Sequence, residues 1–267
     1  MRGEKRSLVD AELLLLLVFV HVFMAFISNK SAAKVHLFFH SSKYVTLVFA
    51  HITKKSYLCG VLYFQNKMKL VFASNNKHKL DEVRKILPSD ICVVGLAELG
   101  FHAEIDETGE TLEENSALKA KTIWTWIAQQ QLTHEVDGVF ADDTGLEIRA
   151  LGGAPGVRTA RWAGEDCNDA SNRQKALQEL SGITDREARF RTVITLITQQ
   201  GTQQVEGIVN GRISEAEEGN GGFGYDPVFI PEGYEQTFAS LPTEVKNSIS
   251  HRARAMEAMR KELRVES

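Results

Sequence analysis

Cysteine is scarce in this sequence, which contains only three, Cys59, Cys92 and Cys167, far apart and in no C-x-x-C pair. Paired cysteines at short spacing mark zinc sites, and an even set of cysteines in a short secreted chain marks a disulfide framework. Neither pattern is present, so the sequence predicts neither kind of site. A reducing compartment fits this use of cysteine, and we expect a cytoplasmic protein.

Positive charge is also limited, because 31 Lys and Arg stand against 35 Asp and Glu in the 267 residues. Residues 1–67 hold nine basic and three acidic residues, a net charge of +6, which leaves 22 against 32 and a net charge of -10 for residues 68–267. A general nucleic-acid binder needs a cationic surface to displace counterions from phosphates. The acidic part is therefore a poor candidate for that class, and any phosphate must be bound at a local site.

A long apolar run of the kind that spans a membrane is missing. The one membrane-like signal, residues 13–27, covers 15 residues and contains His21, whereas a bilayer core needs about 20 apolar residues. A signal peptide or a short anchor is the alternative. We expect no stable membrane association, and we interpret residues 1–67 as a non-catalytic extension that comes from an upstream start codon, with Met68 as the true beginning.

From Met68 onward, strand patterns alternate with helix patterns. Short apolar runs predict strands, and apolar residues three or four positions apart predict helices. The predicted strands are residues 69–73, 91–94, 138–141, 145–150, 190–198 and 205–213. The predicted helices are residues 80–87, a long helix from Thr111, residues 170–181, and residues 243–263 as one or two helices. Such βα units next to a strand pair indicate an α/β domain with a mixed sheet.

The predicted helix that begins at Thr111 has the clearest local signals. Thr111 and Glu114 have the spacing of a capping box, in which each side chain bonds to the backbone N–H of the other. The helical spacing predicts a buried stripe that consists of Ala117, Ala120, Trp124, Ile127 and Ala128.

A polar loop separates the first predicted strand from the first predicted helix. It comprises Ser74, Asn75, Asn76 and Lys77, and Lys79 follows closely. Such a loop presents backbone N–H groups and the positive end of a helix dipole to an anion, which suits a polyphosphate. An ordinary surface turn is the alternative. The G-x-x-x-x-G-K-[ST] pattern of a P-loop is absent.

Acidic residues gather at residues 104–110 and at Asp142 and Asp143. The second pair follows the apolar run 139–141, where unpaired carboxylates are costly to bury. A cation such as Mg²⁺ would relieve that cost, because it binds one or two carboxylates and shares its other positions with water and phosphates. A solvated turn is the alternative. Of the first cluster, we expect only one carboxylate to point inward.

Residues 219–227 place four glycines around Phe223 and Tyr225. Glycine allows the backbone to approach a ligand closely, and Phe223 offers a face for stacking. The alternative is a plain loop with both rings in the core.

Three basic residues, Lys246, His251 and Arg252, lie about one helical turn apart near the start of the last predicted helix, where Ser250 would act as the cap. They are candidate site residues. Ordinary surface positions are the alternative.

Six segments occur in the order that one known family has. They are FASNNKHK at 72–79, ETGETLEEN at 107–115, ADDTGLE at 141–147, LGGAPGVRTARW at 151–162, GGFGYDPVF at 221–229 and KNSISHR at 246–252. Together they resemble the inosine/xanthosine triphosphate pyrophosphatases, the Ham1-like family. The resemblance runs from Met68 to about Leu263. Ser74 and Thr144 stand where many members have Thr and Ser, and both keep a hydroxyl.

The resemblance implies a fold and an activity. The fold would be an α/β structure with an elongated, mixed central sheet flanked by helices and a substrate cleft between two lobes, assembled as a homodimer. The activity would be hydrolysis of non-standard purine nucleoside triphosphates, such as ITP, dITP and XTP, to the monophosphate and pyrophosphate. Such hydrolysis keeps these nucleotides out of DNA and RNA.

The resemblance also implies site residues. Mg²⁺ would be the cofactor, bound by Glu107 and Asp143, and Asp143 would accept a proton from the attacking water. Thr144 would contact substrate. The triphosphate would be held by Ser74, Asn75, Asn76, Lys77, His78 and Lys79. The nucleotide and its base would be surrounded by Phe223, which stacks on the purine, and by Gly224, Tyr225, Asp226, Lys246, His251 and Arg252.

Selectivity would depend on position 6 of the base. Arg252 can only donate hydrogen bonds, so it suits the carbonyl of hypoxanthine or xanthine and not the amino group of adenine. One rival is a pyrophosphatase for other abnormal nucleotides, such as modified pyrimidines. Another is a membrane-anchored nucleotide-binding protein without turnover. The pair Asp142 and Asp143 counts against the second rival, because binding alone needs no water-activating carboxylate.

Overall fold

The computed structural model describes residues 34–39, 45–53, 56–63 and 67–264. The chain divides into two compact units, one up to residue 66 and one from Lys67 onward. The apolar run 13–27 lies outside the described residues. Within the part of the chain that is described, no helix is both long enough and apolar enough to cross a bilayer.

The described part of the first unit is a small sheet. Its strands are β1 (Lys34–Phe39), β2 (Val45–Thr53) and β3 (Ser56–Tyr63). They pair antiparallel in the order β1-β2-β3. Each strand therefore pairs with its neighbour in sequence, which needs only short connections.

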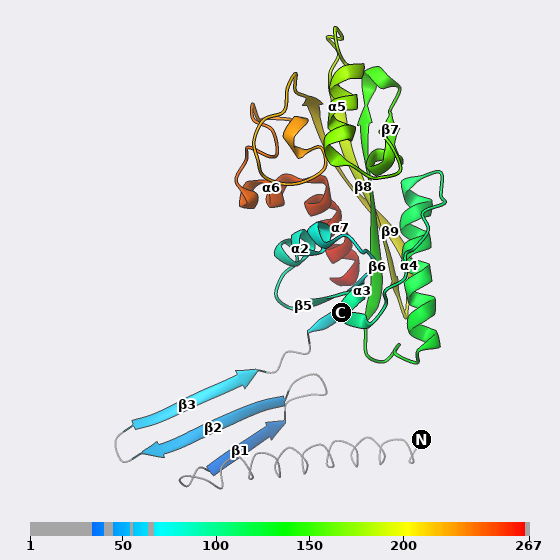
Figure 1. Cartoon of the computed structure of the whole chain (residues 1–267). Coiled ribbons are helices and arrows are strands. Elements are labelled where there is room, and N and C mark those ends of the chain that lie inside the picture. The colour runs from blue at the N-terminus through cyan, green and yellow to red at the C-terminus, as the bar shows by residue number, and fades with distance from the viewer. Residues whose placement is uncertain (1–33, 40–44, 54–55, 64–66, 265–267) are drawn as a thin grey trace. The chain divides into compact units, whose positions relative to one another are not determined.

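The second unit is built on a seven-stranded mixed sheet in the order β10-β9-β8-β6-β4-β5, with β7 paired to β6 (Figure 1). The strands are β4 (Met68–Phe72), β5 (Ile91–Gly95), β6 (Gly138–Ile148), β7 (Pro155–Gly156), β8 (Glu187–Thr198), β9 (Gly201–Ile213) and β10 (Phe229–Pro231). β4 is parallel to β5 and β6, whereas the other pairs are antiparallel. The predicted α/β class with a mixed sheet is confirmed.

Strand β6 corrects the sequence prediction of two strands, at 138–141 and 145–150. The structure has a single strand of 11 residues that passes through Asp142 and Asp143. It pairs with β8 without a break over its whole length. The alternative of a solvated turn is also wrong, because both carboxylates are buried. Polar residues interrupt the apolar pattern here, but partners that are distant in sequence allow the strand to continue.

Six α-helices accompany this sheet in the described residues. They are α2 (Lys77–Ile86), α3 (Leu96–Leu99), α4 (Leu112–Gln129), α5 (Asp169–Glu179), α6 (Thr243–Ile249) and α7 (His251–Arg264). The capping box of Thr111 and Glu114 is present at the start of α4. Ser250 caps α7 as expected, because its Oγ accepts a hydrogen bond from the backbone N of Ala253 at 3.2 Å.

The buried stripe of α4 is turned relative to the predicted one. The prediction is right for Ala120 and Ile127 and wrong for Ala128, which is exposed, while Ala117 and Trp124 are half-buried. The buried residues of the helix are Leu112, Asn115, Ser116, Lys119, Ala120, Ile123 and Ile127. A prediction that follows apolar residues alone misses the polar ones, which are buried because they face β6 and β8.

Helices cover opposite faces of the sheet (Figure 1). α4 packs on β6 and β8, whereas α7 packs on β9 and β8 with α2 beside it. Successive side chains of a strand point to opposite faces. Phe140 accordingly packs with residues of α2 and α7, and Val139 and Ala141 pack with residues of α4. By the same alternation, Asp142 points toward α2 and α7, and Asp143 points toward α4.

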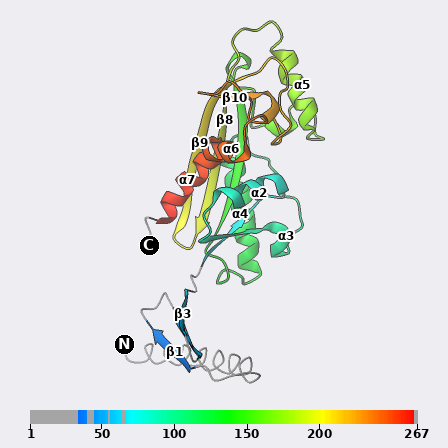
Figure 2. The same cartoon turned by 90° about the vertical axis from the view of Figure 1, so that its left-hand side faces the viewer.

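The long strands β6, β8 and β9 run through two lobes of this unit (Figure 2). α2, α4 and α7 flank them in one lobe. In the other lobe, α5 and the segments around β10 pack on the far ends of the same strands, where Leu146 and Ile148 join a separate core with Leu180 and Phe238. A cavity between the lobes is lined by residues of both.

Candidate active site

The residues predicted for the site surround one cavity of about 340 Å³. All of them line it except Lys77, which is exposed in the first turn of α2. Each of the six sequence segments contributes to the lining. Lining residues that the sequence analysis did not select include Lys119, Thr159, Arg161, Asp169 and Phe190. The fold therefore brings together segments that are widely separated along the chain.

The loop between β4 and α2 forms one wall of this cavity. Asn76 caps α2, because its Oδ1 accepts a hydrogen bond from the backbone N of Lys79 at 3.1 Å. Ser74 Oγ accepts a hydrogen bond from the backbone N of Asn76 at 3.2 Å. These bonds fix the N-terminus of a ten-residue helix at the cavity wall. The N–H groups and helix dipole that suit an anion are therefore in place.

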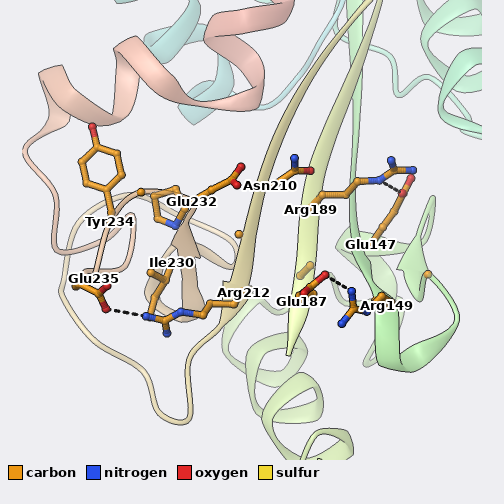
Figure 3. A pocket seen from close by; sticks show the side chains of 15 residues that line it. Glu147, Arg149, Glu187, Arg189, Asn210, Arg212, Ile230, Glu232, Tyr234 and Glu235 are labelled. Carbon is orange, nitrogen blue, oxygen red and sulfur yellow. Dashed lines mark hydrogen bonds and ion pairs between the residues drawn. The ribbon is translucent and has the colours of Figure 1, made fainter. Parts of the chain in front are cut away.

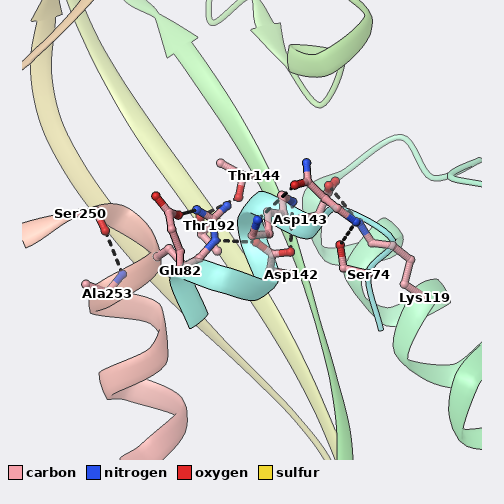
Figure 4. Close-up of polar contacts among 12 residues, drawn as sticks. Ser74, Glu82, Lys119, Asp142, Asp143, Thr144, Thr192, Ser250 and Ala253 are labelled. Atoms are coloured by element: carbon pink, nitrogen blue, oxygen red, sulfur yellow. Dashed lines mark hydrogen bonds and ion pairs between the residues drawn. The ribbon is translucent and has the colours of Figure 1, made fainter. Parts of the chain in front are cut away.

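Asp142 is fully buried and bonded to two cations (Figure 4). Its Oδ1 accepts a hydrogen bond from Lys79 Nζ, and its Oδ2 accepts one from Arg252 Nε, both at 3.0 Å. Burial alone would raise the pKa of Asp142, but the two cations outweigh burial and lower it well below its usual range. Asp142 is therefore a buried carboxylate with both oxygens satisfied.

The ion pairs continue from Arg252 across α2 to α6. Glu82 accepts hydrogen bonds from Arg252 Nη1 and, at 2.6 Å, from Lys246 Nζ. Lys246 Nζ also donates to Asp226 Oδ2 at 2.6 Å, and the same oxygen accepts the backbone N–H of Phe223 at 2.8 Å. We call this row of alternating charges the ionic chain. Its members in order are Lys79, Asp142, Arg252, Glu82, Lys246 and Asp226.

Phe223 is half-buried and lines the cavity beside this chain. His78 stacks against its ring with centroids 5.6 Å apart. Lys246 Nζ and Arg252 Cζ lie 5.1 Å and 5.7 Å from the ring centroid, within the range of cation–π contacts. The alternative for residues 219–227, with both aromatic rings in the core, is right only for Tyr225. This residue packs in the core that also contains Leu180 and Phe238.

Asp143 lies on the α4 side of β6, opposite Asp142, and shares a cation with Glu107. Lys119 Nζ donates to Glu107 Oε1 at 2.6 Å and to Asp143 Oδ1 at 3.3 Å. Asp143 Oδ2 is buried and has no hydrogen-bond partner among the described residues. Burial raises the pKa of Asp143, with Lys119 acting in the opposite direction. Asp143 is therefore a buried carboxylate at the cavity, and one of its oxygens has no hydrogen-bond partner among the described residues.

The acidic loop before α4 behaves as the sequence predicts. Glu104, Asp106 and Glu110 are exposed, and Glu107 is half-buried and faces the cavity. Among the residues that the structure describes, no three His, Cys, Asp or Glu side chains are arranged to hold a metal ion. A magnesium site here would therefore consist of Glu107 and Asp143 with water or substrate oxygens, which is a common arrangement for this ion.

His251 is buried and lines the cavity. Its ring stacks on Phe190 with centroids 4.5 Å apart. Burial, reinforced by Arg252 and Lys246, lowers the pKa of His251 well below its usual value. α7 approaches β9 closely here, because a Cβ added at Gly207 would lie 2.2 Å from the backbone O of His251. The alternative of ordinary surface positions is wrong for all three basic residues, which are buried.

Three charged features of this site were not predicted from the sequence. They are the presence of Glu82, the presence of Lys119, and the ion pairs that Asp142 makes with cations of the protein. Glu82 follows Lys79 by three positions, which places both on one side of a helix, and this spacing could have suggested it. The alternation of side chains in a strand could have separated Asp142 from Asp143, had the segment been recognised as one strand. Lys119 has no comparable local signal, because its partners come from other elements.

Another cavity, of about 750 Å³, is lined by residues of β6, β8, β9 and β10 and of the segment that follows β10 (Figure 3). It contains none of the predicted site residues. Its arginines are paired with acidic neighbours: Arg189 with Glu147, and Arg212 with Glu235. These pairs are partly exposed, so this surface lacks the buried, unsatisfied groups of the cavity between the lobes.

The chain is similar in sequence to known proteins of one family. The sequence model of the Ham1 family matches residues 70–262. A dITP/XTP pyrophosphatase of Porphyromonas gingivalis is 48% identical over 195 residues, which cover 72% of this chain and 95% of that protein. A dITP/XTP pyrophosphatase of Bacillus subtilis is 44% identical, with 72% and 94% covered.

Solved structures give the same result. The Ham1 protein of Staphylococcus aureus matches with a TM-score of 0.64 and 39% identity, over 74% of this chain and 100% of that one. A HAM1 protein of Coxiella burnetii matches with a TM-score of 0.65 and 34% identity, over 75% and 100%. The matches of sequence and of structure thus cover almost the whole length of these relatives.

Proposed function

Because this chain belongs to the Ham1 family, we propose that it hydrolyses non-standard purine nucleoside triphosphates, such as ITP, dITP and XTP. The products are the nucleoside monophosphate and pyrophosphate. The chain is a nucleoside triphosphate pyrophosphatase, and its activity removes these nucleotides from the pool that supplies DNA and RNA synthesis. Its relatives carry the name dITP/XTP pyrophosphatase.

The observation that supports this function most directly is the placement of Asp143. Its Oδ2, which has no partner among the described residues, is buried beside a cavity that has the N-terminus of α2 at one wall and the ring of Phe223 at another. A nucleoside triphosphate has complementary parts, a polyanion and an aromatic base. In the proposed mechanism, Asp143 accepts a proton from water as that water attacks the α-phosphate.

The residues present also fit a magnesium ion. Glu107 and Asp143 lie close enough to share one cation, because the ammonium of Lys119 already bridges them. Asp143 Oδ2 offers a further acceptor. We propose that Glu107 and Asp143 hold Mg²⁺. Bound there, the ion would supply positive charge to phosphate oxygens in a domain that is itself acidic.

The other wall residues would bind the rest of the substrate. Residues 74–79 would hold the triphosphate, with Lys79 supplying charge, and Phe223 would stack on the purine. Arg252 uses two of its donors on Asp142 and Glu82. An arginine has five N–H donors and no acceptor, so the remaining donors suit a 6-carbonyl and not the amino group of adenine.

An assay of pyrophosphate release with ITP, XTP, GTP, ATP, TTP and a modified pyrimidine triphosphate, with and without Mg²⁺, tests this function. We expect ITP and XTP to be turned over fastest, and only with the metal. Preference for the modified pyrimidine would favour the rival pyrophosphatase. Nucleotide binding without pyrophosphate release would favour the non-catalytic nucleotide-binding protein.

We further propose that residues 68–267 carry the whole activity and work as a homodimer in the cytoplasm. All residues of the candidate site lie in this part of the chain. Residues 68–267 expressed alone should match the full chain in turnover, and light scattering should give twice the monomer mass. A shorter protein with much lower turnover would show that the extension contributes to the enzyme. Fractionation of the endogenous protein tests its location.

A further inference from the structure

Lys119 is the one lysine of α4 that is buried within the site. Only 7% of its side chain is exposed, and its ammonium contacts both Glu107 and Asp143. Lys121, two positions later on the same helix, is exposed. A strand alternates sides at every residue, so Asp143 reaches this lysine whereas Asp142 turns toward α2 and α7.

The two carboxylates need a cation at this position. Glu107 is half-buried and Asp143 is buried, and two nearby carboxylates that lose water repel each other unless a positive charge lies between them. Lys79 does not fill this role, because its ammonium is bonded to Asp142. Lys119 therefore provides the positive charge that compensates this pair.

The ammonium of Lys119 also has space to move. Lys119 lines the cavity between the lobes, together with Glu107 and Asp143. A lysine has a long, flexible stem with a charged tip that can be redirected at small cost. Its ammonium can therefore leave the two carboxylates without any shift of α4.

We propose that Lys119 is a placeholder cation, which occupies the position between Glu107 and Asp143 in the metal-free enzyme and gives way to the metal ion. The proposal rests on the metal ligands named above. Because the metal ion replaces the ammonium, the negative charges of Glu107 and Asp143 are balanced by a cation both before and after the metal binds. The displaced ammonium then faces the cavity, at the side where the substrate's phosphates would lie.

Competition for the same carboxylates has a measurable consequence. A monovalent ammonium in contact with both ligands opposes the approach of a divalent ion, because like charges repel strongly at short range where water is largely excluded. Part of this is offset when the lysine relaxes into the cavity. We therefore expect removal of the charge at position 119 to strengthen metal binding about tenfold.

Mn²⁺ alone, without nucleotide, is a suitable probe, followed by calorimetry and by the electron paramagnetic resonance signal of the free ion. Lys119→Met removes the charge and keeps the length of the stem. It should bind Mn²⁺ about tenfold more tightly than the wild type. Lys119→Arg, which keeps the charge, should show no gain. Lys121→Met removes the same charge from an exposed position of α4 and should bind like the wild type.

The location of the ion is checked with Asp143→Asn, which should abolish the high-affinity binding. An affinity of Lys119→Met equal to or lower than that of the wild type would overturn the proposal. If this variant is too unstable for calorimetry, the rise of its melting temperature on addition of Mn²⁺ decides instead. Stabilisation by Mn²⁺ larger than in the wild type supports the placeholder role, and equal or smaller stabilisation contradicts it.

Turnover has no part in these measurements. If the protein fails to release pyrophosphate from any triphosphate, the proposed function is wrong while the Mn²⁺ titration still reports on Lys119. If turnover is normal and the affinities do not change, only the placeholder role is wrong.

Discussion

Two carboxylates that are neighbours in one strand have contrasting surroundings. Asp142 faces α2 and α7, where Lys79 and Arg252 satisfy both of its oxygens. Asp143 faces α4, where one lysine contacts one oxygen and the other oxygen has no partner in the described residues. The first has a lowered pKa and the second a raised one. The alternation of a β-strand is enough to separate them.

This difference indicates different tasks. Each oxygen of the buried Asp142 carboxylate is bonded to a cation, so Asp142 organises the cations around it. A buried carboxylate with a free oxygen is costly to maintain, and such groups are concentrated at functional sites. We therefore propose that the chemistry takes place on the Asp143 face of β6, where one carboxylate oxygen has no partner among the described residues.

The largest effect is expected on the Asp143 face. Asp143→Asn keeps the size of the side chain and removes both the proposed proton acceptor and a metal ligand. Turnover of ITP should fall on the order of 10²-fold or more, while the variant remains folded by circular dichroism. Asp106→Asn, in the exposed part of the acidic loop, is the matched control and should keep its activity. Retention of more than about a tenth of the turnover would remove Asp143 from this role.

Asp142→Asn should act mainly on stability. The amide can no longer compensate both Lys79 and Arg252, and breaking a buried ion pair typically costs about 3 kcal/mol or more of unfolding free energy. Urea unfolding measures this loss, and Asp143→Asn is the comparison, because its carboxylate has a raised pKa and fewer bonds to lose. If Asp142→Asn and Asp143→Asn lowered the unfolding free energy equally, the ion pairs on the two faces of β6 would not differ in how much they stabilise the fold.

Arg252→Ala should have a smaller effect on turnover and act on selectivity, while the loss of its buried ion pairs also lowers the free energy of unfolding. Loss of the guanidinium removes the donor proposed for the 6-carbonyl, so KM should rise more for ITP than for ATP, by about tenfold. Steady-state kinetics on both substrates measures the ratio. Arg254→Ala, an exposed arginine of the same helix, is the control. Equal losses on ITP and ATP would show that Arg252 does not recognise the base.

Much of the fold could be predicted from local sequence signals. Strand β4, predicted at residues 69–73 and found at Met68–Phe72, depends on residues close in the chain, as do the capping box at Thr111 and the cap at Ser250. The unbroken strand β6 could not be predicted in this way, because Asp142 and Asp143 remain in a strand only with partners from α2, α4 and α7.

The site shows the same division. The resemblance selected residues that the structure places around one cavity, but it did not select the ion pairs that hold them. Glu82 accepts hydrogen bonds from both Lys246 and Arg252, each of which lies more than 160 positions later in the sequence. Such a bridge is a property of the tertiary fold, and neither spacing nor composition indicates it.

The smallest effect concerns the pH dependence of stability. Asp142 has a lowered pKa in the folded state, so its ion pairs contribute stability above the pKa of the unfolded chain, about 3.9, and this contribution is lost as the pH falls below that value. Asp142→Asn lacks this contribution. The difference in unfolding free energy between wild type and variant should therefore be constant above about pH 5 and shrink by about 1 kcal/mol between about pH 4 and pH 3.

Urea unfolding followed by tryptophan fluorescence across this pH range measures the difference. Asp81→Asn, at an exposed position of α2, is the control, because an exposed carboxylate gains little from the folded state and its difference from the wild type should stay small throughout. If the difference in unfolding free energy between wild type and Asp142→Asn stayed constant down to about pH 3, Asp142 would titrate alike in the folded and unfolded states. The cations of α2 and α7 would then not stabilise its charge, and the two faces of β6 would not differ as the ion pairs indicate.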